Sequence, residues 1–164
     1  MTVVGRKVLA GVLGAGVVLA AGGCSLFQKD DTESVSVFDV KIGDCFTVPQ
    51  DAKKIATDLA TLPRVDCATP HEQESYALEK YTDPGTDTAP ENFPGAAALK
   101  AFADGRCAEK FAGYVGVDYR DSELYFTYLV PSPRSWEKDA DRTTICFITT
   151  TGEDLTRSVK QTGW

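Results

Sequence analysis

The sequence predicts an α+β domain in which a small antiparallel sheet packs against one main helix and is stapled by two disulfides. Three observations predict this class: short segments rich in β-branched and aromatic residues, one long amphipathic segment, and an even number of cysteines after position 24. The chain has 164 residues, which is enough for one domain with its own core. We expect that domain to span residues 35–164.

The first half of the domain has the pattern of short strands separated by turns. Residues 35–40 are rich in valine, a KIGD turn follows, and residues 45–48 form a second strand, so we expect an opening hairpin. Residues 51–62 carry no strong pattern and are interpreted as a loop. Further strands are expected at residues 64–67 and 74–81.

The second half contains the clearest element, a helix over residues 95–114. Its apolar residues recur at helical spacing on one face, which predicts that Cys107 points into the core. Residues 121–130 have bulky side chains on both faces and are expected as a central strand. Residues 143–151 form another strand, and residues 155–159 are expected to add an edge strand.

The first 23 residues have the layout of a bacterial lipoprotein signal peptide. Arg6 and Lys7 form a basic start, residues 8–21 are an uncharged run, and the sequence AAGGC ends at Cys24. The run has 14 residues, whereas a helix needs about 20 to cross a membrane. We therefore expect the signal peptide to be removed.

Cys24 then becomes the first residue of the mature protein. We expect it to carry diacylglycerol and palmitate, with residues 24–34 as a spacer that holds the domain at the outer face of the cell membrane. The alternative is ordinary secretion with cleavage near Ala21, which leaves Cys24 as a free thiol.

The charge excludes one broad class of partner. The chain has a formal charge of −7 and an isoelectric point near 4.7. Without residues 1–23, 15 basic residues face 24 acidic ones, a side-chain charge of −9. Nucleic-acid binders neutralise phosphates with Lys and Arg, so we expect no nucleic-acid partner.

Four cysteines remain in the domain: Cys45, Cys67, Cys107 and Cys146. An even number in an exported chain indicates two disulfides, for which three pairings are open. We favour Cys45 with Cys67 and Cys107 with Cys146, because each pair then staples neighbouring elements in chain order. The alternative, a metal site, lacks the short cysteine or histidine spacings of zinc sites, so we expect no metal.

Five motifs occur in a fixed order along the domain: VFDVKIGDCF, VDCATPHEQESYAL, RCAEKFAGYVGVDY, SELYFTYLVPSPRSW and DRTTICF. Over residues 37–150 they resemble the septum formation family, found in exported and membrane-anchored proteins of high-GC Gram-positive bacteria. The chain departs from the pattern at Ala140, where a glycine often precedes the Asp-Arg pair. The resemblance implies a link to division septa and no defined biochemical activity.

Candidate catalytic groups are few. His71 is the only histidine, so acid–base or nucleophilic schemes that need an imidazole must use it, yet its place beside Pro70 favours a structural role. No GxSxG motif is present, and oxidised cysteines provide no nucleophile. Carboxylate pairs such as Asp83 with Asp87 and Asp139 with Asp141 are common in an acidic chain, and the DADR stretch that holds the second pair lacks the glycine and distal glutamate of a calcium loop. We expect no enzyme activity and no cofactor.

Candidate binding residues are Trp136, Tyr119 and His71. Aromatic residues are enriched both in binding grooves and in cores, so the alternative is that Trp136 belongs to the core. We expect a non-enzymatic envelope module that binds an envelope protein, a division protein or cell-wall material. The alternatives are a wall-acting enzyme that uses His71 or a carboxylate pair, and a carrier with an internal cavity for a small apolar ligand.

Overall fold

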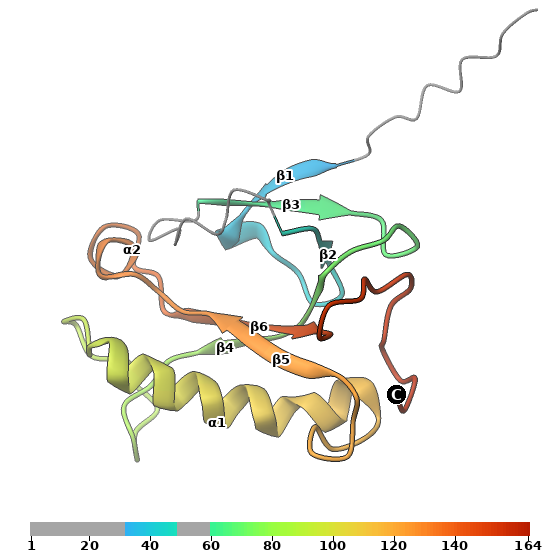
Figure 1. The fold of residues 1–164 in the computed structure, drawn as a ribbon. Helices are drawn as coiled ribbons and strands as arrows, with labels where there is room; N and C mark the ends of the chain where they lie inside the picture. The colour runs from blue at the N-terminus through green and yellow to red at the C-terminus, as the bar shows by residue number, and fades with distance from the viewer. Residues whose placement is uncertain (1–31, 49–59) are drawn as a thin grey trace, which may run out of the picture.

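The computed structural model describes residues 32–48 and 60–164, which form six strands and three helical segments (Figure 1). The strands form one antiparallel sheet in the order β1–β3–β2–β4–β6–β5, so the predicted α+β class is confirmed. In chain order the elements are β1 (Glu33–Ser36), the 3-10 helix η1 (Val37–Asp39), β2 (Cys45–Phe46), β3 (Thr61–Val65), β4 (Gln73–Lys80), α1 (Ala96–Val115), β5 (Tyr125–Leu129), α2 (Pro133–Lys138) and β6 (Thr143–Thr149).

The predicted signal peptide, Cys24 and residues 51–59 of the expected loop lie outside the described residues. The end of that expected loop is wrong, because Thr61 and Leu62 belong to β3, where they pair with β1. Within residues 32–48 and 60–164, no helix combines the length and the apolar composition needed to cross a membrane.

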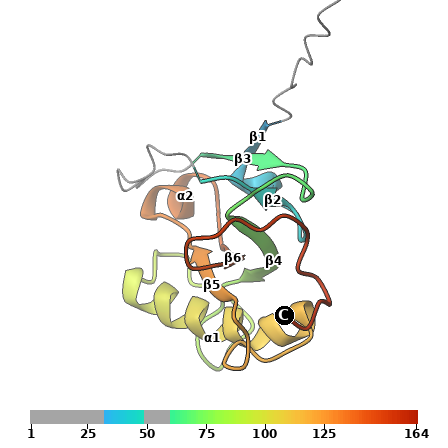
Figure 2. The same cartoon turned by 45° about the vertical axis from the view of Figure 1, so that its right-hand side comes forward.

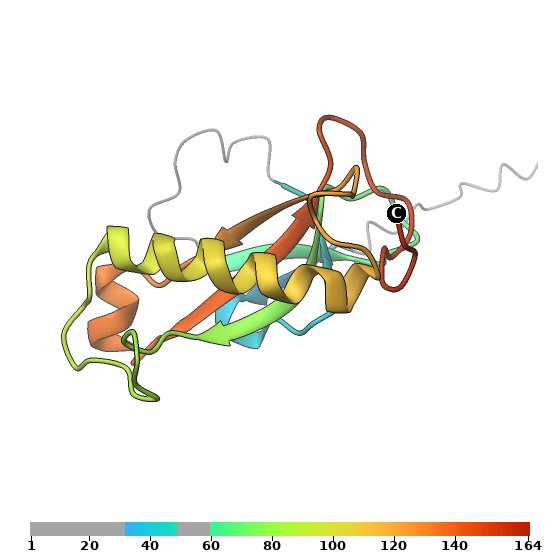
Figure 3. The same ribbon diagram turned by 90° about the horizontal axis from the view of Figure 1, so that it is seen from below.

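The fold has three layers, because the sheet bends between β2 and β4 (Figures 1 and 2). Helix α1 runs obliquely across one face of β4, β6 and β5 (Figure 3). On the other face, Phe46 and Leu62 from the first strands pack against Ile145 and Phe147 of β6. One core cluster therefore lies on each side of β6.

The helix α1 buries the face that its sequence predicts. Leu99, Ala103, Cys107 and Phe111 follow at steps of four and are all fully buried. The helix ends at Gly116, whose φ of +98° is the left-handed conformation that favours glycine. Its N–H donates to the Ala112 carbonyl at 2.9 Å.

Both favoured disulfides are present. Cys107 of α1 is bonded to Cys146 of β6, which fixes the helix to the sheet. Cys45 of β2 is bonded to Cys67, which follows β3. The expectation that each bridge staples neighbouring elements is confirmed.

The predicted opening hairpin is wrong. β1 pairs with β3, with Val35 opposite Leu62, while β2 pairs with β3 and β4. The chain between β1 and β2 turns through η1, where the Ser36 hydroxyl accepts a hydrogen bond from the Phe38 N–H. This local turn leads β2 away from β1, so that β3 inserts between them.

Two further strand predictions are corrected. β5 is an edge strand and not a central one, because it pairs with β6 alone. Its bulky side chains are partly buried, Phe126 and Tyr128 in the core on the α1 side and Leu129 in the core on the other side. Residues 155–159 form no strand and contribute only the bridge between Leu155 and His71. The segment is held instead by side-chain contacts to the buried Glu74.

Candidate functional pocket

A pocket of about 720 Å³ opens on the sheet face opposite α1. Its floor contains a row of three apolar side chains on adjacent strands: Leu78 of β4 lies opposite Ile145 of β6, and Ile145 lies opposite Leu129 of β5. Cross-strand partners point to the same face of a sheet. The volume is within the range of about 300–1,000 Å³ typical of small-ligand sites.

The roof of the pocket is the 3-10 segment that follows β1. Val37, Phe38 and Val40 line the pocket from this side, together with Ala60. Phe38 is 56% exposed, which is high for a phenylalanine beside an apolar floor. The roof and the floor therefore present apolar surfaces to the same space.

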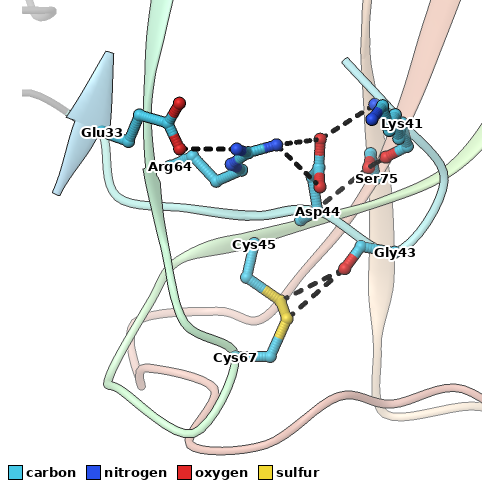
Figure 4. A network of polar contacts seen from close by, with 8 residues as sticks. All are labelled: Glu33, Lys41, Gly43, Asp44, Cys45, Arg64, Cys67 and Ser75. Atoms are coloured by element: carbon cyan, nitrogen blue, oxygen red, sulfur yellow. Dashed lines mark hydrogen bonds and ion pairs between the residues drawn. A yellow bond between two sulfur atoms is a disulfide. The ribbon is translucent and has the colours of Figure 1, made fainter. Parts of the chain in front are cut away.

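A polar network holds the turn that follows the roof (Figure 4). The Asp44 carboxylate accepts a hydrogen bond from the Lys41 N–H at 2.9 Å and pairs with Arg64 at 3.4 Å. Arg64 also pairs with Glu33 of β1 at 2.5 Å, and the Ser75 hydroxyl donates to the Lys41 carbonyl at 2.6 Å. These bonds join β1, β3 and β4 around one turn and so fix the end of the roof.

The side wall is the start of α2. The Ser132 hydroxyl accepts from the Ser135 N–H, and the Ser135 hydroxyl accepts from the Ser132 N–H, each at 3.0 Å. This reciprocal capping, with Pro133 at the start of the helix, is typical of a well-defined helix N-terminus. The wall is therefore the capped first turn of α2.

Charged side chains line the pocket beside these walls. Lys80 and Arg134 are cationic, and Asp139 and Asp141 are anionic. The Asp141 carboxylate is committed to the structure, because it accepts from the Thr143 N–H at 3.0 Å and from the Ser135 hydroxyl at 3.1 Å. Such an arrangement accommodates an apolar group with a polar or charged end.

The structure places Trp136 in the core. The side chain is 1% exposed and packs edge-on against Tyr81 and Phe93. Its Nε1 donates to the Glu91 carbonyl at 3.0 Å, and the Arg142 guanidinium lies 3.7 Å from the ring centre. Of the two interpretations that the sequence allowed for Trp136, a binding residue or a core residue, the structure shows the second.

His71 is also fully buried. Its Nδ1 lies 2.7 Å from the Thr69 carbonyl oxygen, which only accepts, so Nδ1 is the donor in this hydrogen bond. A ring nitrogen of His71, a Glu74 oxygen and Cys45 Sγ lie within 4.8 Å of one another. Cys45 Sγ is bonded to Cys67, so this sulfur is not a thiolate that could bind a metal ion.

Glu74 in this cluster has three hydrogen-bond partners. Its carboxylate accepts from the Tyr114 and Ser158 hydroxyls, each at 2.6 Å, and from the Val159 N–H at 2.8 Å. Burial, and secondly the bond to Glu74, raise the pKa of Tyr114, so this phenol stays protonated and donates. The cluster ties the C-terminal segment to the sheet.

Tyr119, the third candidate binding residue, lies on the α1 side of the sheet. It packs edge-on against Phe111 and Phe126 and is 38% exposed. The three candidates thus do not form one site, and none of them lines the pocket. The alternation of side chains along each strand could have predicted that Leu78, Leu129 and Ile145 face the same side of the sheet. That the three side chains are neighbours depends on the order of the strands, which the sequence does not show.

A family model described as Septum formation matches residues 42–163. The chain belongs to the septum formation family. This confirms the resemblance and connects the protein with septum formation. The matched range includes the floor and the side wall of the pocket, whereas the roof residues Val37, Phe38 and Val40 precede it. No curated protein and no solved structure matches the chain.

Proposed function

We propose that this septum formation protein is a non-enzymatic lipoprotein that binds an envelope ligand at the outer face of the cell membrane. The pocket between η1 and α2 is the observation that carries the proposal. It supplies an apolar floor, an apolar roof and charged side chains, which are the elements of a binding site. The family match indicates the cellular process in which this binding would act, septum formation.

The proposed anchor is the lipid on Cys24. Eight residues separate Cys24 from Glu33, the first residue of β1, and the nine steps between them span at most about 30 Å. The pocket roof follows β1 directly. A lipidated Cys24 would therefore keep the pocket close to the membrane surface. Labelled palmitate should enter the wild-type protein and fail to enter Cys24→Ala; incorporation into both would exclude Cys24 as the acceptor.

The geometry of the candidate catalytic residues supports binding rather than catalysis. A general base needs access to substrate, and His71 is 0% exposed with its Nδ1 committed to Thr69. Asp141 is committed to Thr143 and Ser135. Hydrolysis of purified cell wall by the oxidised protein, abolished in His71→Ala, would overturn this part of the proposal.

The same pocket supports a second candidate, a carrier of a small apolar molecule. Both candidates place an apolar group on the floor formed by Leu78, Ile145 and Leu129. They differ in location, because a carrier has no reason to gather at septa. Ligand binding is therefore tested in solution, and enrichment of the protein at septa is tested in dividing cells.

The solution experiment uses a matched pair of substitutions on β6. Thr143 lines the pocket, and Thr149 lies at the other end of the same strand, six residues away and outside the pocket lining. Thr143→Trp places an indole in the pocket, while Thr149→Trp is the control for the added bulk. The probe is the neutral apolar dye N-phenyl-1-naphthylamine.

We expect saturable dye fluorescence with one site for the wild type and for Thr149→Trp. Thr143→Trp should bind at least tenfold more weakly, because the added ring occupies the space above the apolar floor. Absence of saturable binding in the wild type, or equal binding by Thr143→Trp, would contradict the pocket as the binding site. Circular dichroism and the unfolding midpoint check that both variants fold.

A further inference from the structure

The strand β5 (Tyr125–Leu129) has one open edge. It pairs with β6 on one side and ends the sheet on the other (Figure 1). Among residues 32–48 and 60–164, backbone groups of residues 125–129 bond only within the pairing with β6. Alternate residues of an antiparallel strand direct their N–H and C=O groups to opposite sides, so the outer side keeps unpaired donors and acceptors.

This edge lacks the features by which proteins protect open strands. Its sequence, YFTYL, contains no charge, proline or glycine, and its register with β6 is unbroken. The opposite edge, β1, has four residues and carries Glu33, which is paired with Arg64 of β3. An unprotected, uncharged edge is a surface suited to pairing with another strand.

Side chains on both faces of β5 could contact an added strand. Tyr125 is 53% exposed and shares a face with Thr127 and Leu129, the last of which lines the pocket. On the α1 face, Phe126 packs against Tyr119, which is 38% exposed. A strand paired with β5 would meet an exposed tyrosine on each face.

We propose that the β5 edge binds an extended peptide segment of a partner protein by strand addition. The segment would have apolar or β-branched residues along its length and a basic residue beside Asp121 and Glu123, two exposed acidic residues just before β5. This goes beyond the proposed function, because the edge is a different surface from the pocket and its backbone groups recognise a polypeptide.

Charge favours a basic peptide over a second copy of the chain as the occupant. Without residues 1–23 each copy carries a side-chain charge of −9, so two copies repel each other. A basic segment is attracted to the same surface and to Asp121 and Glu123 in particular.

The test uses the soluble oxidised protein without residues 1–24 and the synthetic peptide Lys-Val-Thr-Val-Thr-Val-Lys. A second peptide has the same sequence with alternate backbone nitrogens methylated, which removes the donors for strand pairing and keeps the side chains. Thr127→Lys places a cation on the β5 edge beside the basic peptide. Ser34→Lys places the same charge on β1 and is the matched control.

We expect the unmethylated peptide to shift the amide signals of residues 125–129 and to bind at least fivefold more weakly to Thr127→Lys than to Ser34→Lys. The methylated peptide should bind at least tenfold more weakly. The pocket variant Thr143→Trp should keep peptide binding, which separates this proposal from the pocket.

Three results would overturn the proposal: no binding of the unmethylated peptide, equal binding of both peptides, or equal binding by Thr127→Lys and Ser34→Lys. Sedimentation of the protein alone gives a further decisive outcome. A wild-type dimer that Thr127→Lys converts to a monomer would assign the edge to a second copy of this chain instead.

Discussion

Glu74 shows how a single buried carboxylate holds the C-terminal segment. It is fully buried and accepts hydrogen bonds from Tyr114, Ser158 and Val159. Removing an acceptor leaves buried donors without a partner, which costs more than the bond itself. We expect Glu74→Ala to lower the free energy of unfolding by about 3 kcal/mol.

Glu72→Ala is the control for this prediction. Within the part of the chain that the structure describes, the Glu72 carboxylate makes one exposed bond, to the Val48 N–H at 2.9 Å, so its loss should cost less than about 1 kcal/mol. Urea unfolding of both variants measures the difference. Equal destabilisation would show that the bonds around Glu74 add no stability beyond that of a surface carboxylate.

Asp118 provides a prediction for pH. Hydrogen bonds from the Arg120 guanidinium, and then from the Arg120 N–H, lower the pKa of Asp118 to about 2. Because the folded-state pKa is depressed, the contribution of this pair to stability is present above the ordinary aspartate range near pH 4 and is lost as the pH falls towards 2. NMR titration should find the depressed pKa in the wild type and a higher value in Arg120→Ala; an ordinary pKa in the wild type would contradict it.

At the residue scale, the cysteine pairing favoured from the sequence and the structural role favoured for His71 agree with the structure. Chain order favoured the observed bridges among the three possible pairings, because each bridge closes between neighbouring elements. The role of Glu74 was not predictable, because its partners Tyr114 and Ser158 are 40 and 84 residues away along the chain. The sequence did not decide whether Trp136 lies in the core or in a binding groove, since aromatic residues occur in both; the structure places it in the core.

At the scale of the elements, α1 offers two glycines at which replacement by alanine should change the free energy of unfolding in opposite directions. Gly105 lies inside the helix with nothing within 4 Å of the position of an added Cβ, whereas Gly116 ends the helix at a φ of +98°. Gly105→Ala should raise the free energy of unfolding by about 1 kcal/mol, because alanine favours the helix. Gly116→Ala should lower it by about 1 kcal/mol, because the left-handed conformation strains an L side chain.

Thermal or urea unfolding of the two variants, at matched protein concentration, measures both changes. A stabilised Gly116→Ala would show that the helix does not end in the left-handed conformation. A destabilised Gly105→Ala would place that residue in a close contact that the structure lacks.

The sequence predicted α1 and β6 well, because helical periodicity and a β-branched run are local signals. For β4 the signals for strand and helix were mixed, and the preceding cysteine and proline favoured the strand that the structure shows. The order of strands in the sheet, in contrast, depends on contacts between segments that are distant in the sequence. β5 has bulk on both faces, which predicted a central strand, but it lies at the edge, with its faces partly buried by α1 and by the first layer. The pocket depends on the same order, which explains why its floor was not predicted.

At the scale of the whole molecule, the bent sheet separates two surfaces with different chemistry. The pocket opens between the two parts of the sheet, and the β5 edge faces outwards. The two disulfides cross-link the elements around them, one in each half of the fold. The proposed lipid anchor at Cys24 would hold both surfaces near the membrane, where a division protein or cell-wall material is within reach.

The most direct test of the proposed role is the position of the full-length protein in dividing cells, with a C-terminal fluorescent tag that matures outside the cytoplasm. Wild type and Thr149→Trp should be enriched at septa. Thr143→Trp, present in the membrane fraction at the same level, should spread evenly because its pocket is filled. An even distribution of the wild type, or septal enrichment of Thr143→Trp equal to that of Thr149→Trp, would contradict a pocket-dependent role in septum formation.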